Sequence, residues 1–301
     1  MSAFFGNPMV TTAALPLLLG IVLAVIARPR PALPASSSVL TLAWSALLLF
    51  FYWDTLGPPA VPPVAASQKL IYLAFVGIGV GLLPARILSA RTAGALAGVA
   101  VAAALFWLGW RRISGGALDL QMIAAIVAGA LAIIGAAMLM SRTASVPPTV
   151  EEPFLAPAAV LATALSGAII SVLGASIVTG QLLGSLAAMT GGWCLVQYVA
   201  TLRGSAAAPW SKGVEFLLLY ANATVLIQVA LLAPKANPAA LILSPLPMIV
   251  AALAHGPLQG LLPGARSLRP LIAGILIAIP AILAILAAIV WAPHGAALGF
   301  S

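Results

Sequence analysis

The chain consists of long apolar runs separated by short polar segments. Runs of roughly 18 or more apolar residues are long enough to cross a hydrocarbon core of ~30 Å as helices. Candidate spans lie near 9–27, 39–53, 70–84, 92–110, 119–140, 153–174, 174–202, 213–233, 239–254 and 270–291. A transmembrane barrel would instead show alternating strands of ~10 residues. The pattern predicts an all-α polytopic integral membrane protein, a bundle of about ten helices (eight to ten) with no soluble domain.

The sixth and seventh spans are separated by an argument from length. The stretch 153–202 holds fifty residues without one charge. As a single helix it would be ~75 Å long at 1.5 Å per residue, far more than a bilayer needs. We therefore expect it to fold back near Gly174.

Composition supports the membrane class. The chain is 63% hydrophobic and only 6% charged, whereas soluble domains carry about a quarter charged residues. The net charge of +8 fits the excess of Lys and Arg that membrane proteins keep in cytoplasmic loops. We therefore expect the lipid bilayer as partner and no nucleic acid. The lone Cys194 excludes a disulfide framework within the chain.

The distribution of Lys and Arg predicts the orientation. With the N-terminus outside, nine would lie in inside loops: Arg28, Arg30, Arg86, Arg91, Arg142, Arg203, Lys212, Arg266 and Arg269. Four would lie outside: Lys69, Arg111, Arg112 and Lys235. The positive-inside rule therefore places both termini outside. The Ala-rich composition and short loops are typical of a bacterial inner membrane.

A Pro-rich segment divides the single transmembrane domain 1–301 into two halves. The loop 143–152 joins 1–142 to 153–301, and each half contains five candidate spans. An odd number of spans per half would orient the halves oppositely, as in the inverted repeats of many transporters. The halves share no convincing sequence identity, so this 5+5 arrangement rests on the span count alone.

Glu215 is the acid with the clearest functional potential. It lies about one turn into the eighth span, and Asn222 shares its face, offset by about 20° on a helix of 3.6 residues per turn. Ionisable groups inside spans are costly and often mark ion or substrate pathways. The alternative is an interfacial ion pair with Lys212, three residues earlier. We predict a substrate- or ion-binding role for Glu215 and Asn222.

Small residues recur every fourth position in GASIVTGQLLGSLAAMTGG, residues 174–192. Ser176, Gly180 and Gly184 are expected to form one helix-packing face, because small residues let backbones approach closely. We therefore interpret the seventh span as a central packing helix and expect Gly184→Leu to disrupt the bundle. Gln181 and Ser185 flank this face and are the remaining candidates for substrate or ion binding.

Pro245 and Pro247 interrupt the ninth span. Each removes a backbone N–H and frees a carbonyl. Lipid cannot satisfy these groups, so neighbouring helices or a water-lined cavity must do so. The sequence predicts a helix break, which is either a packing kink or part of a transporter's binding site.

Recognisable catalytic and cofactor motifs are missing. The histidines, His255 and His294, lie outside span centres, and no metal, haem or nucleotide motif occurs. We therefore predict no metal, no cofactor and no catalytic residues, and we favour a protein that is not an enzyme.

Three functions remain open at this point. The first is a small-molecule or ion transporter. The second is a scaffold or accessory subunit, with other membrane subunits or further copies of the chain as partners. The third is a membrane enzyme acting on lipid. In length and span count the chain is similar to the drug/metabolite transporters, a resemblance of size that carries over no motif residue.

Overall fold

The computed structural model describes residues 9–28, 37–115, 119–143, 149–233 and 235–291. Arg30, His294 and part of the connector 143–152 lie outside these residues. Every regular element in the described part is helical. The helices are a π-helical turn Val10–Ala14, α2 Leu15–Ile26, α3 Ser37–Leu56, α4 Ala66–Gly81, α5 Ala90–Ser114, α6 Leu120–Met140, α7 Glu152–Leu173, α8 Ile177–Leu202, α9 Lys212–Leu232, α10 Pro238–Leu243, α11 Leu246–Ala254, a 3-10 turn Gln259–Leu261 and α12 Leu268–Trp291.

Seven of these helices are long and apolar enough to cross a membrane, namely α3, α5, α6, α7, α8, α9 and α12. Three shorter apolar helical segments accompany them, at Val10–Ile26, Ala66–Gly81 and Pro238–Ala254. The structure is therefore compatible with the predicted helical membrane protein. The count of ten crossings and the lack of a soluble domain stay predictions.

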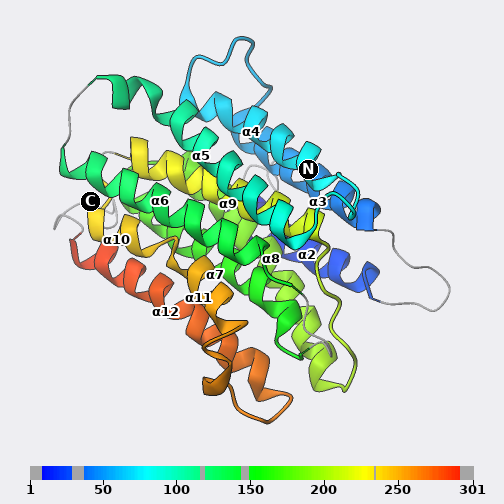
Figure 1. Cartoon of the computed structure of the whole chain (residues 1–301). Coiled ribbons are helices and arrows are strands. Elements are labelled where there is room, and N and C mark those ends of the chain that lie inside the picture. The colour runs from blue at the N-terminus through cyan, green and yellow to red at the C-terminus, as the bar shows by residue number, and fades with distance from the viewer. Residues whose placement is uncertain (1–8, 29–36, 116–118, 144–148, 234, 292–301) are drawn as a thin grey trace.

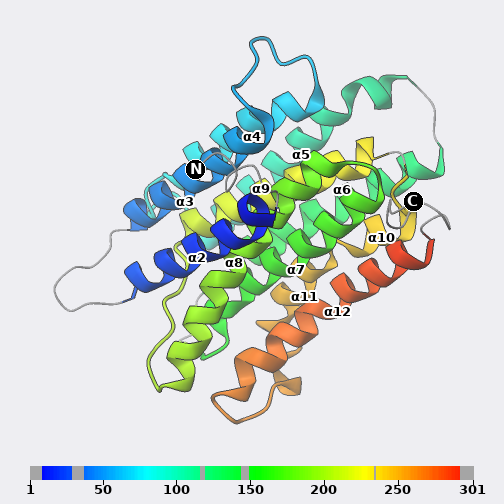
Figure 2. The ribbon, with the colours of Figure 1, turned by 180° about the vertical axis from the view of Figure 1, so that it is seen from behind.

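The helices lie side by side along one common direction (Figures 1 and 2). Helix α9 occupies the centre, because it packs against α3, α4, α5, α6, α7 and α8. Of its apolar stretch 89% is buried, against 56% for α8. The expectation of a central seventh span is thus corrected: α9, which lacks a small-residue row, is the central helix, and α8 packs mainly between α7 and α2.

One end of the bundle carries most of the described cations. We call it the arginine-rich end and define it by Arg28, Arg86, Arg91, Arg142, Arg203, Lys212, Arg266 and Arg269. These residues follow the last turns of α2, α4, α6, α8 and α11 or lie in the first turn of the next helix. Lys69, Arg111, Arg112 and Lys235 lie at the opposite end. The alternation of helix directions therefore reproduces the expected segregation of charge.

The small residues of α8 face different neighbours rather than forming one surface. Ser176 precedes the helix as its N-cap residue. A Cβ added at Gly180 would lie 2.7 Å from Val172 Cγ2 of α7, whereas one at Gly184 would meet only the Thr12 carbonyl oxygen, at 3.8 Å. The predicted single face is therefore corrected, since each step of four residues turns the position by about 40°.

The closest approach involves α2 and α8. A Cβ at Gly192 would lie 2.3 Å from the Leu17 carbonyl oxygen, and one at Gly20 would lie 1.9 Å from the Met189 carbonyl oxygen. Both distances are too short for any side chain. The backbones of α2 and α8 touch here, so these two glycines, rather than Gly184, determine the crossing.

The ninth candidate span is broken into α10 and α11, at the position of the two prolines. Pro245 is the N-cap residue of α11, and Pro247 lies in its first turn. The Ser244 hydroxyl lies 3.4 Å from the Ser166 hydroxyl of α7, and both residues are fully buried. A side-chain hydroxyl at the break thus faces a hydroxyl of a neighbouring helix.

Candidate functional site

A cavity of about 500 Å³ lies at the arginine-rich end. We call it the end cavity. Its wall comes from the ends of α6, α7, α8 and α9 and from the segment before α12. Ser205, Pro209 and Arg266 on its rim are exposed, whereas Thr201 and Trp210 on its wall are buried. The cavity therefore opens outward at this end and reaches into the bundle.

Glu215 holds two cations at the wall of the end cavity. Its carboxylate lies 2.9 Å from Lys212 Nζ and 3.6 Å from an Arg142 Nη atom. The side chains of Arg142 and Glu215 are only 8% and 13% exposed. Burial lowers the pKa of Arg142 below its ordinary value, and the charges of Glu215 and Glu152 oppose this shift. The Glu215–Lys212 pair considered from the sequence is therefore present, and Arg142, just after the end of α6, joins it.

A second ion pair joins α7 to the start of α12 beside the cavity. Arg269 Nε lies 2.8 Å from a carboxylate oxygen of Glu151, whose side chain is 1% exposed. The contact lacks the alignment of a linear hydrogen bond. It joins the start of α7, which lines the cavity, to the start of α12.

Three tryptophans meet beside the end cavity, and one of them, Trp210, lines it. The ring centroids of Trp44, Trp193 and Trp210 lie 5.5–6.1 Å apart, within the usual range for aromatic pairs. All three are buried, and none of their indole N–H groups has an acceptor among the described residues. Buried Trp N–H groups usually have a partner. We call these residues the tryptophan cluster.

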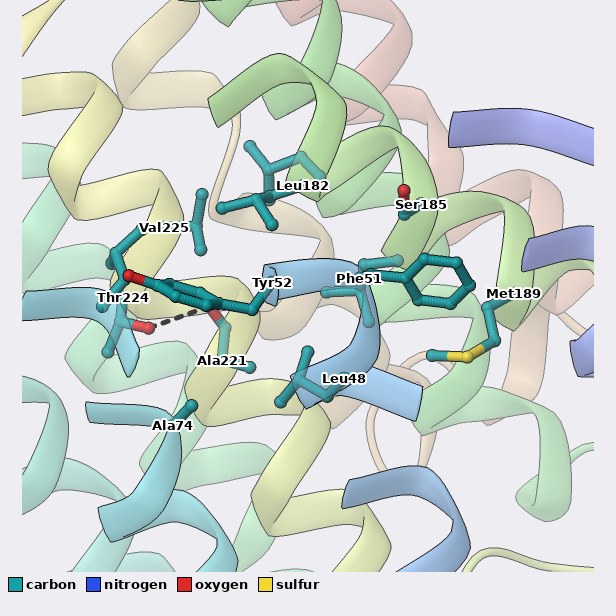
Figure 3. A pocket seen from close by; sticks show the side chains of 13 residues that line it. Leu48, Phe51, Tyr52, Ala74, Leu182, Ser185, Met189, Ala221, Thr224 and Val225 are labelled. Atoms are coloured by element: carbon teal, nitrogen blue, oxygen red, sulfur yellow. Dashed lines mark hydrogen bonds between the residues drawn. The ribbon is translucent and has the colours of Figure 1, made fainter. Parts of the chain in front are cut away.

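A second, much smaller cavity lies deeper in the bundle between α3, α4, α8 and α9. Figure 3 shows it: Phe51 and Met189 lie at one side, with Tyr52 and Thr224 at the other. Its volume is about 40 Å³, room for little more than one water molecule. We call it the central cavity. Its lining is largely apolar, and the Thr224 hydroxyl donates to the Ala221 carbonyl oxygen of the same helix.

One buried stripe of α8 winds around the helix from the central cavity to the end cavity, turning by about 40° at each step of four residues. It consists of residues four apart: Ser185, Met189, Trp193, Gln197 and Thr201. The first two line the central cavity, Trp193 belongs to the tryptophan cluster, and Thr201 lines the end cavity. The side-chain Oε1 of Gln197 accepts from the Ala208 N–H, and Nε2 of the same side chain has no acceptor among the described residues. The tryptophan cluster therefore separates the two cavities.

The residues expected to bind a substrate or ion are not gathered at one site. Glu215 lines the end cavity and Ser185 the central cavity. The Asn222 side chain is fully buried and donates to the Val160 carbonyl oxygen of α7 at 3.2 Å. Gln181 is half-buried and lines neither cavity. Pro245 and Pro247 are buried and also line neither cavity.

Sequence reasoning missed Arg142, Arg266 and the tryptophan cluster. The two arginines were used only in the positive-inside count, because a cation at the end of a span is normally explained by its position at the membrane interface. The four-residue spacing of Trp193, Gln197 and Thr201 was a usable signal, since polar and aromatic residues on one face of a span indicate an internal wall.

Neither metal ligands nor relatives identify the chemistry. Within the described ranges, no three His, Cys, Asp or Glu residues come close enough to hold a metal ion. Comparison of the chain with protein-family models, curated proteins and solved structures finds no match.

Proposed function

We propose that the protein is a multi-pass membrane transporter for a small molecule or ion. The observation that carries the proposal is the buried stripe of α8 that connects the end cavity, the tryptophan cluster and the central cavity. A transporter needs a polar entrance at one membrane face and a barrier that closes the path in the other direction. The end cavity supplies such an entrance, and the tryptophan cluster supplies such a barrier.

In this proposal the structure corresponds to one state of an alternating-access cycle. Solute would enter the end cavity and contact the Arg142–Glu215–Lys212 cluster. Passage toward the central cavity would require the three indole rings to separate, because about 40 Å³ is too little for any solute larger than a few atoms. Movement of a few packed side chains with their helices is a common form of gating.

The membrane topology is part of the proposal. We place ten crossings in the bilayer, with α10 and α11 together as one, and the arginine-rich end in the cytoplasm. Both termini are then outside, and the halves 1–142 and 153–301 are of opposite orientation. The Ala-rich chain would reside in a bacterial inner membrane.

The proposal is tested by uptake into liposomes containing the purified full-length protein. The probes are a panel of radiolabelled small organic anions, zwitterions and cations that do not cross lipid unaided. At least one class should accumulate above the level of empty liposomes, and Glu215→Gln should abolish that uptake. Arg203→Gln, which alters an exposed arginine at the same end, should leave uptake unchanged.

A scaffold or accessory subunit is the second candidate. It is favoured by the small size of the central cavity and by the packed surroundings of the α10–α11 break. If no probe class accumulates and the protein is purified from native membranes with a partner in fixed stoichiometry, the scaffold replaces the transporter.

A further inference from the structure

We propose that the end cavity binds the head group of an amphiphile with one negative charge and a single apolar chain, and that the chain lies in a groove beside α12. This inference rests on the proposed function, since it names the solute class of the same cavity. It also stands on observations of its own, which concern charge, the groove and the junction between them.

The charges around the end cavity favour a monoanion. Arg142, Lys212 and Arg266 line it together with the carboxylates of Glu152 and Glu215, so three cations face two anions and one positive charge remains. Among the described ion pairs, Glu215 engages Arg142 and Lys212, and Arg266 takes part in none. Arg266 is therefore the cation that a bound anion would neutralise, and guanidinium matches the oxygens of an anionic head group well.

The unpaired cation also limits the chemistry of the head group. Arg266 presents only N–H donors, so it selects for acceptor oxygens, as a carboxylate, sulfonate or phosphate ester provides. The Trp210 indole N–H is not a contact for this ligand, because that atom is buried away from the cavity although the side chain lines it.

An apolar groove of about 340 Å³ lies on the flank of the bundle. Helices α8 and α12 form its sides and α7 its floor. Its lining includes Ala158, Leu165, Cys194, Gly274, Ala278 and Ile282. Along α7 it extends from Phe154 to Leu165, about 16 Å at the rise of a helix. Such a narrow apolar groove on a helix flank fits one alkyl chain.

Residues that line the groove and residues that line the end cavity are near neighbours in the chain at three places. On each of three chain segments, a cavity residue stands within four positions of a groove residue: Pro153 beside Phe154, Thr201 near Tyr198, and Arg266 near Pro270. At this junction the Tyr198 hydroxyl donates to the Ser267 carbonyl oxygen at 3.3 Å. A basic pocket at the end of an apolar helix groove is the arrangement that holds lipid-like anions. The adjacency of the two sites thus argues for one ligand that spans both.

The test is binding of dodecanesulfonate, whose sulfonate stays ionised, measured by native mass spectrometry of the full-length protein. A sterol-based detergent keeps alkyl chains out of the groove. We expect one molecule of dodecanesulfonate to bind per chain. Tail-less methanesulfonate and uncharged dodecanol should each bind at least about tenfold more weakly than dodecanesulfonate, since each lacks one of the two contacts. Dodecyltrimethylammonium, which reverses the charge, should not bind at this site.

Two variants and their matched controls assign the site. Arg266→Gln removes the unneutralised charge, and Gly274→Phe fills the groove at a glycine whose added Cβ would meet no atom within 4 Å. Each should weaken binding by about tenfold without changing the unfolding temperature. Arg203→Gln, exposed at the same end, and Leu286→Phe, exposed on α12 outside the groove, should bind normally.

The outcomes separate this inference from the transport proposal. Equal binding of dodecanol and dodecanesulfonate, or unchanged binding in both folded site variants, overturns the inference. Site-specific binding of dodecanesulfonate, together with no liposome uptake of any probe class, supports the inference and contradicts transport. Uptake of tail-less anions without amphiphile binding supports transport and contradicts the inference.

Discussion

At the scale of single residues, Glu215 is the group on which the end cavity most depends. Its carboxylate neutralises Arg142, whose side chain is only 8% exposed. In Glu215→Gln the guanidinium keeps its charge in a largely desolvated place, and removing one partner of a buried pair typically costs roughly 3 kcal/mol. We therefore expect a clearly lower thermal unfolding midpoint of the purified protein in detergent, relative to Arg203→Gln.

The double variant Arg142→Gln/Glu215→Gln tests the cause. It removes both charges together, so much of the lost stability should return. If the double variant is as unstable as the sum of its single variants, the destabilisation comes from lost packing or hydrogen bonds rather than from an unpaired charge.

Contacts between single residues could be predicted from the sequence where both partners lie close together in the chain. Lys212 lies one helical turn before Glu215, and that pair could be read from spacing alone. Arg142 lies just after the end of α6, far from Glu215 in the chain, and only tertiary packing brings the two together. Asn222 shares the helix of Glu215, but its partner is the Val160 carbonyl oxygen of α7.

At the scale of elements, the crossing of α2 and α8 leads to a prediction that compares two glycines of the same helix. A methyl group at Gly192 would lie 2.3 Å from a backbone oxygen, whereas one at Gly184 has no atom closer than 3.8 Å. Gly192→Ala should therefore destabilise the protein by about 1–3 kcal/mol, as overpacking does, and Gly184→Ala should be nearly neutral. Thermal unfolding of the two variants measures the difference, and equal stability would mean that α2 does not pack on α8 as described.

The same elements show why the packing face could not be predicted from the small-residue row. Periodicity identified the helices, because the apolar runs and the two prolines are local features. The row from Ser176 to Gly192 turns around α8, so its members meet α7, the π-helical turn and α2 in succession. For Gly180 that neighbour is the preceding helix α7, but for Gly184 and Gly192 it comes from the other half of the chain.

At the scale of the whole molecule, the orientation of the bundle is directly measurable. In a Cys194→Ala background the chain has no other cysteine, so Arg203→Cys and Lys235→Cys report the two ends separately. A membrane-impermeant maleimide should label Lys235→Cys in intact cells, and Arg203→Cys only after permeabilisation, because the arginine-rich end is predicted to be cytoplasmic. The reverse pattern would place the entrance of the end cavity outside the cell.

In the proposed transporter the solute passes through the end cavity, and a plug in that cavity tests this passage most directly. Ser205 is exposed and lines the cavity, whereas Arg203, two residues earlier, is exposed and does not line it. In the Cys194→Ala background, a bulky maleimide attached to Ser205→Cys should abolish liposome uptake of the anion that the unmodified protein accumulates. The same reagent on Arg203→Cys should leave uptake unchanged. Undiminished uptake by fully labelled Ser205→Cys would contradict the account.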